Sequence, residues 1–92
     1  MKGFEKELKD EGFVHVYEWT DKPHTKYPAH KHRGKVSFYI LKGSITMNFE
    51  DGRAANLKKG DHMKVPMGVT HTAEVGPAGC TFIVGEEIEG DS

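Results

Sequence analysis

The chain has 92 residues, with thirteen basic side chains against fourteen acidic ones and a formal net charge of −1. A nucleic-acid-binding domain needs a basic surface to neutralise phosphates, and a peripheral membrane anchor needs a basic cluster, so this balance argues against both classes. The longest apolar run, residues 38–41, is far too short to cross a bilayer. We therefore expect neither nucleic acid nor a membrane as a partner.

A chain of this length is expected to fold as one domain spanning residues 1–92. We place the core at about residues 13–85, with a peripheral N-terminal segment and a peripheral acidic tail, Glu86–Ser92. The single cysteine, Cys80, cannot form an intrachain disulfide, and the charged start of the chain is not typical of a secretory leader. Both observations favour a cytoplasmic location.

The sequence predicts a series of short strands. At the start, Phe4 and Leu8 have helical spacing, which leaves a helical turn and a fraying terminal strand as alternatives. Glycines then divide the chain into pieces rich in β-branched and aromatic residues, which suit a pleated surface. These expected strands are Phe13–Trp19, Val36–Leu41, Ser44–Glu50, Arg53–Leu57, His62–Val65, Thr70–Val75 and Cys80–Val84.

The segments between these strands contain turn-forming residues. Asp51-Gly52 predicts a two-residue hairpin turn, and Lys42-Gly43 predicts a second tight turn. Residues 66–68 and 76–79 contain proline and glycine and predict longer loops. Several short strands joined in this way predict an all-β sandwich or barrel.

Three histidines carry the chemistry of the sequence. His30 and His32 are two residues apart, so on an extended chain they project from the same face, as a pair of metal ligands must. A solvated histidine pair on a basic loop is the alternative, because basic residues flank both. His71 begins a later strand after a Pro-x-Gly turn, and in a small barrel it could meet the first pair.

Two motifs in this region resemble those of the cupin superfamily. The second cupin motif is matched at every spacing by Gly60, Pro66, Gly68 and His71, and the first is matched by His30, His32 and Gly43. The resemblance spans residues 30–71 and implies a small double-sheet jelly-roll barrel of the cupin, or RmlC-like, kind. Related single-domain cupins often pair through N-terminal strands, so it also implies a homodimer in which Phe13–Trp19 takes part.

One residue of the family pattern is missing. Counting back from Gly43, Val36 stands where the family has its glutamate ligand, and no neighbouring position restores a carboxylate. The resemblance therefore implies a three-histidine site of His30, His32 and His71. Three imidazoles suit divalent iron, zinc, copper or nickel and leave positions open for water or substrate. The alternative is that the site has lost its metal and that Val36 fills the space.

The remaining candidates surround this site. Lys35, Val36, Phe38 and Met47 are the expected ligand-binding residues. Lys35 could hold an anion directly, although a solvated lysine at a strand start is the simpler interpretation.

The best candidates for proton transfer are Tyr39 and His62, and Tyr27 could place a hydroxyl group in the mouth of the barrel. Because Tyr39 alternates with Phe38, its packing on the outer face is the favoured interpretation. His62 lies two residues after the motif glycine Gly60, where it could act as a base next to the metal ligands.

Together these features predict a metal-binding cupin that handles a small anionic or oxygen-rich molecule. They do not decide whether the protein is an enzyme. The alternative is a metal-free cupin module that binds a small molecule, or serves a regulatory role, without catalysis.

Overall fold

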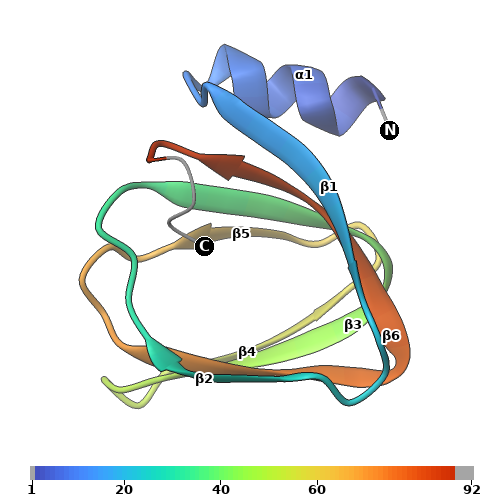
Figure 1. Ribbon diagram of the computed structural model, residues 1–92, viewed down its shortest axis with the longest axis vertical. Helices are drawn as coiled ribbons and strands as arrows, with labels where there is room; N and C mark the ends of the chain where they lie inside the picture. Colours follow the sequence, from blue (N-terminus) through green and yellow to red (C-terminus); the bar gives the residue numbers. More distant parts are fainter. Residues whose placement is uncertain (1, 89–92) are drawn as a thin grey trace.

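The computed structural model of the protein describes residues 2–88. One helix is followed by six strands that form a barrel open at its ends (Figure 1). In chain order the elements are α1 (Lys2–Asp10), β1 (His15–Asp21), β2 (Lys26–His30), β3 (Val36–Phe49), β4 (Ala54–Lys58), β5 (His62–Val65) and β6 (His71–Glu86).

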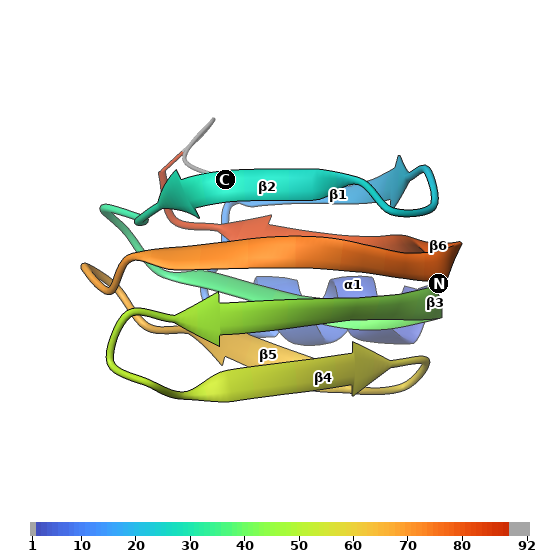
Figure 2. The same cartoon turned by 90° about the horizontal axis from the view of Figure 1, so that it is seen from below.

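Two long strands organise the barrel. Strands β3 and β6, of 14 and 16 residues, pair with each other in antiparallel fashion along most of their length. Strands β1 and β5 flank one half of this pair, while β2 and β4 flank the other half. The two halves fold over each other as two layers, one of which faces the viewer in Figure 2 with α1 behind it. The predicted all-β double-sheet fold is confirmed.

The long strands are continuous where the sequence predicted breaks. The turn expected at Lys42-Gly43 and the loop expected over residues 76–79 are wrong, because both segments lie within strands. The register passes from Gly43 opposite Cys80 to Ile45 opposite Val75, so residues 76–79 form a bulge. Gly43 has φ +74°, and a Cβ added there would lie 1.9 Å from the carbonyl oxygen of Gly79. Glycine is therefore used here to bend the strands rather than to reverse them.

The bend also changes which side chains face the barrel interior. Before it, the even-numbered residues Val36 and Phe38 line the interior pocket, and after it the odd-numbered Ile45 and Met47 do so. An extra residue in one strand shifts the alternation by one position, so the inner face stays apolar through the irregularity.

The hairpin between β3 and β4 differs slightly from expectation. The amide of Phe49 donates to the carbonyl of Arg53 at 2.8 Å, which leaves three residues in the turn rather than two. Gly52 takes the left-handed conformation, with φ +95°. A three-residue loop with glycine in this position is the next most favoured hairpin after the two-residue type.

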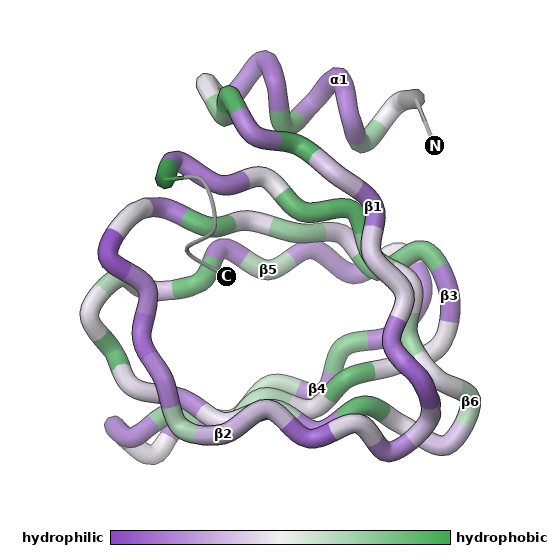
Figure 3. The backbone as a smooth tube through the Cα atoms, viewed as in Figure 1, coloured by the Kyte–Doolittle hydropathy of each residue, from purple (hydrophilic) through white to green (hydrophobic). Residues whose placement is uncertain are grey.

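Helix α1 confirms the helical alternative for the N-terminal segment and covers the outside of one sheet. Its Leu8 is fully buried in a second apolar cluster with Tyr39, Leu41 and Ile83. The ring of Phe4 stacks on that of Tyr39, with 4.3 Å between centroids. The rest of the helix is mostly hydrophilic, as its purple colour in Figure 3 shows. This one-sided pattern is that of a helix packed on a sheet surface.

Two further segments correct the sequence-based interpretation. Residues 26–30 form a strand, β2, which was not among the expected ones. Glu86, assigned to the acidic tail, is instead the last residue of β6 and is only 2% exposed. Residues 89–92 of that tail lie outside the described residues. Within residues 2–88, no helix has the length and apolar character needed to cross a membrane.

The contact between α1 and the barrel can be tested through Tyr39. Its hydroxyl group donates to Glu7 at 2.7 Å, and this bond together with burial raises the pKa of Tyr39 to about 12. An unfolded tyrosine ionises near pH 10, so this stabilisation is complete below pH ~10 and is lost as the pH rises towards ~12. We expect Tyr39→Phe to lower the free energy of unfolding at neutral pH by about 0.5–1.5 kcal/mol. Denaturant unfolding at neutral and alkaline pH should show a smaller decline above pH ~10 in the variant than in the wild type. An equal decline would contradict this assignment.

Candidate metal centre and pocket

The three histidines of the two motifs meet at one end of the barrel. His30 ends β2 and lies opposite His71, which begins β6, while His32 lies in the connection from β2 to β3. The ring centroids are 4.4 Å apart for His30 and His71, 5.0 Å for His32 and His71, and 5.2 Å for His30 and His32. One nitrogen of each ring lies within 4.8 Å of the others. The convergence expected from the sequence is thus present.

Backbone carbonyl groups orient two of these rings. The Nδ1 atom of His30 lies 2.8 Å from the carbonyl oxygen of Pro28, and that of His71 lies 3.2 Å from the carbonyl oxygen of Val69. A carbonyl oxygen can only accept a hydrogen bond, so Nδ1 carries the proton in both rings. The lone pair of each neutral ring is then on Nε2, which is the arrangement found in metal-bound histidines.

The environment of His71 also favours the metal-binding form. Burial lowers the pKa of His71, the hydrogen bond to Val69 opposes this shift, and charge on His30 or His32 lowers the pKa further. The ring is therefore neutral at pH 7, as a metal ligand must be.

The geometry fits a transition-metal ion. With bonds of about 2.0–2.1 Å, tetrahedral zinc brings neighbouring ligand nitrogens to about 3.3 Å from one another. The three nitrogens lie within 4.8 Å of one another, so they would need to approach by up to about 1.5 Å to hold such an ion. Among residues 2–88, these three histidines are the one group of possible ligands that converges in this way. A set of three imidazoles leaves at least one coordination position for another molecule.

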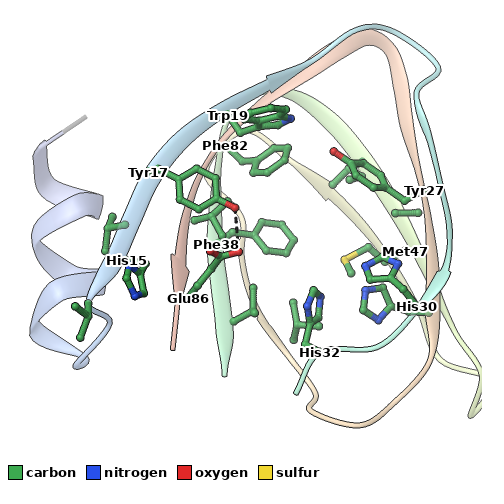
Figure 4. Close-up of a pocket in the computed structure, with 18 residues that line it drawn as sticks. His15, Tyr17, Trp19, Tyr27, His30, His32, Phe38, Met47, Phe82 and Glu86 are labelled. Atoms are coloured by element: carbon green, nitrogen blue, oxygen red, sulfur yellow. Dashed lines mark hydrogen bonds between the residues drawn. The ribbon is translucent and has the colours of Figure 1, made fainter. Parts of the chain in front are cut away.

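The histidines line one end of a cavity of about 730 Å³ inside the barrel (Figure 4). Between its polar groups, the wall of this cavity is apolar and comes from both sheets. Three of the four expected ligand-binding residues, Val36, Phe38 and Met47, are part of this wall. A cavity of this size, mainly apolar with a few polar groups, is typical of a small-molecule site.

A buried carboxylate forms a second polar region of the cavity. The hydroxyl group of Tyr17 donates to Oε2 of Glu86 at 3.0 Å, as drawn in Figure 4, and both residues line the cavity. Neither residue was among those predicted from the sequence. The alternation along β6 could have predicted the position of Glu86, because Phe82, Val84 and Glu86 are every second residue and all line the cavity. The expected strand ended at Val84, before Gly85, and therefore left out Glu86.

Tyr27 also reaches the cavity, as expected for a residue near its mouth. Its hydroxyl group donates to the carboxylate of Asp21. Burial raises the pKa of Tyr27 well above its usual range, and the neighbouring Asp21 carboxylate adds to the shift. Tyr27 is therefore held as a neutral phenol.

The other sequence candidates lie outside the cavity. Tyr39 and His62 belong to the outer face, where their rings stack with centroids 4.1 Å apart and His62 Nε2 lies 2.5 Å from the Ser37 hydroxyl group. Lys35 is exposed, and its backbone pairs with Glu87. The alternation along β3 explains these positions, because Lys35, Ser37 and Tyr39 are odd-numbered in the half where even-numbered residues face inward. The proposed catalytic role of Tyr39 and His62 gains no support from this placement.

The family model described as "Cupin domain" matches residues 17–84, which contain all three histidines. The chain therefore belongs to the cupin family. No curated protein matches it at a significant level.

Solved structures agree with this assignment. An RmlC-like cupin from Shewanella frigidimarina is 26% identical, with a TM-score of 0.68 over 83% of this chain and 68% of that one. The polyketide cyclase RemF from Streptomyces resistomycificus is also 26% identical, with a TM-score of 0.67 over 79% of this chain and 54% of that one. The DMSP lyase DddQ from Ruegeria pomeroyi is 22% identical, with a TM-score of 0.70 over 84% of this chain but only 39% of that one. The fold is shared by proteins of different activities, so it does not define a substrate.

The ligand set can be tested by removing one histidine. We expect His71→Ala to weaken zinc binding by more than about 100-fold, beyond the usual effect of losing a residue that only orients a ligand. Titration of the metal-free protein against a chromogenic chelator measures this affinity. As a control, His24→Asn changes an exposed histidine with φ 62°, a conformation that asparagine tolerates. Wild-type affinity in a folded His71→Ala protein would remove His71 from the ligand set.

Proposed function

We propose that this cupin binds one divalent transition-metal ion through His30, His32 and His71 and uses the site to bind a small anionic or oxygen-rich molecule. The observation that carries the proposal is the convergence of three ring nitrogens within 4.8 Å at the end of a cavity inside the barrel. Iron, zinc, copper and nickel all accept such a donor set. The proposal leaves the reaction, if there is one, unassigned.

The charge of the site favours an anionic ligand. Three neutral imidazoles bring no negative charge, so a divalent ion held by them keeps its full charge and attracts anionic oxygen. When bound, such an ion would supply Lewis acidity, polarising an oxygen atom of a ligand or acidifying a bound water molecule. The apolar wall around it lowers the local dielectric constant, which strengthens the attraction.

The experiment compares metal-loaded and metal-stripped protein with acetohydroxamate as the probe, since it loses its proton on chelation and binds a metal ion as an anion through two oxygen atoms. Isothermal calorimetry should detect binding to the loaded protein and none to the stripped protein. Lys35→Ala is the matched control, because Lys35 is exposed outside the cavity and its loss should leave the affinity unchanged. Equal binding with and without metal would contradict the proposal and favour the metal-free binding module instead.

We also propose that two copies associate through β1. Within the described residues, β1 pairs on one side only, with β6. Large apolar side chains at this edge are exposed, Val14 by 79% and Trp19 by 53%. An unpaired strand edge with exposed apolar residues favours pairing with another strand. Sedimentation velocity should detect a dimer of the wild type and a monomer of Trp19→Glu. A wild-type monomer at micromolar concentration would overturn this expectation.

A further inference from the structure

Aromatic side chains gather in the wall of the cavity. The chain contains one tryptophan, three tyrosines and five phenylalanines, and five of these nine rings line this one space. They are Tyr17, Trp19, Tyr27, Phe38 and Phe82. Aliphatic side chains fill an apolar interior equally well, so the gathering of rings around an open space suggests contact with a flat molecule.

Three of these rings, Trp19, Phe82 and Phe38, form a group that we call the aromatic row. Trp19 of β1 lies opposite Phe82 of β6 in the strand register, so the two side chains project from the same face of the sheet. The ring of Phe82 pairs in turn with that of Phe38 on β3, with 5.8 Å between centroids. In Figure 4 the three rings follow one another along one side of the cavity.

Tyr27 faces the cavity from the other layer of the barrel. It lies on β2, which pairs with the first half of β6, whereas β1 pairs with the second half. The hydroxyl group of Tyr27 donates to Oδ2 of Asp21, and the indole N–H of Trp19 donates to Oδ1 at 2.9 Å. One carboxylate therefore holds a ring from each layer and fixes their relative position before a ligand binds, which lowers the entropic cost of binding.

Packing of the core alone does not account for these rings. Phe38 is buried, but Tyr27 and Phe82 are only partly buried and lie against the apolar core rather than within it. Trp19 is 53% exposed. A flat apolar molecule in the cavity would cover ring surface that water now contacts, which is favourable.

The aromatic part of the cavity adjoins the metal centre. The centroid of the Tyr27 ring lies 6.4 Å from that of His30. A molecule whose anionic oxygen is held at the histidines would therefore place its neighbouring atoms beside Tyr27. An aliphatic group in this position gains only burial, whereas an aromatic ring also gains edge-to-face or offset-stacked contacts with the surrounding rings.

We propose that the cavity binds a small aromatic acid whose anionic oxygen is held at the three histidines and whose ring lies between Tyr27 and the aromatic row. This inference rests on the function proposed above for the oxygen end. The ligand class is an aromatic ring that carries its anionic group directly. The cavity of about 730 Å³ has room for such a ring in addition to the oxygen atoms.

The test compares three probes on metal-loaded protein: acetohydroxamate, cyclohexanecarbohydroxamate and benzohydroxamate. The last two carry rings of similar size, of which only the second is aromatic. Isothermal calorimetry should show that the wild type prefers benzohydroxamate to its cyclohexane analogue, and that Tyr27→Leu lowers this preference by about threefold or more. The affinity for acetohydroxamate should stay unchanged in the variant. Comparing the preference between proteins removes any difference between the two probes in their intrinsic affinity for metal.

Phe4→Leu is the matched control, because it also replaces an aromatic ring with leucine but lies outside the cavity, where Phe4 stacks on Tyr39. It should retain the wild-type preference. Should Tyr27→Leu fail to fold, Phe82→Leu provides the second variant, with the same expected loss. Trp19 is left unchanged, because it also belongs to the proposed contact between two copies.

The outcomes separate this inference from the function on which it rests. If acetohydroxamate binding depends on metal but the preference for benzohydroxamate is equal in wild type and Tyr27→Leu, the aromatic site is overturned and the metal function stands. If no probe binds more tightly to loaded than to stripped protein, the proposed function fails, and the two ring probes on stripped protein then measure the aromatic site alone. A preference for benzohydroxamate that Tyr27→Leu abolishes would support the site there, and the absence of any preference would overturn it.

Discussion

The structure depends on one long antiparallel pair, β3 with β6, that bends without breaking. At the bend, Gly43 lies so close to the carbonyl group of Gly79 that any side chain at position 43 would collide with the backbone. Bending there turns what would be a flat ladder into two layers facing each other around an interior. The short strands add to the edges of this frame, and helix α1 covers one outer face.

This frame also sets the chemistry of the interior. Strand β6 begins at His71 in the metal centre and ends at Glu86 in the carboxylate region, so a single strand carries both polar ends of the cavity. Its pairing with β2 brings His30 opposite His71, and its pairing with β1 supports the contact between Tyr17 and Glu86. Both ends are therefore supported by backbone hydrogen bonds, which limits their movement and favours a fixed geometry for ligands.

The sequence predicted the parts of the site that follow from motif spacing and strand alternation. His30, His32 and His71 were identified in this way, as were Val36, Phe38 and Met47 in the cavity wall. The predicted turns were wrong where a glycine can serve either of two structural roles, because Gly43 and Gly79 allow a bend in a strand as readily as a turn. The same ambiguity at Gly85 ended the last strand too early and hid Glu86. Whether a glycine ends a strand or bends it depends on which strand pairs with that segment. This pairing is set by the tertiary structure and not by the local sequence pattern.

The central proposal is that His30, His32 and His71 by themselves hold a functional metal ion. The most direct measurement is the metal content of tag-free protein by inductively coupled plasma mass spectrometry. The account predicts about one iron, zinc, copper or nickel ion per chain, because three neutral imidazoles suffice for these metals. Protein that is isolated without metal and also binds none when it is added would contradict the account.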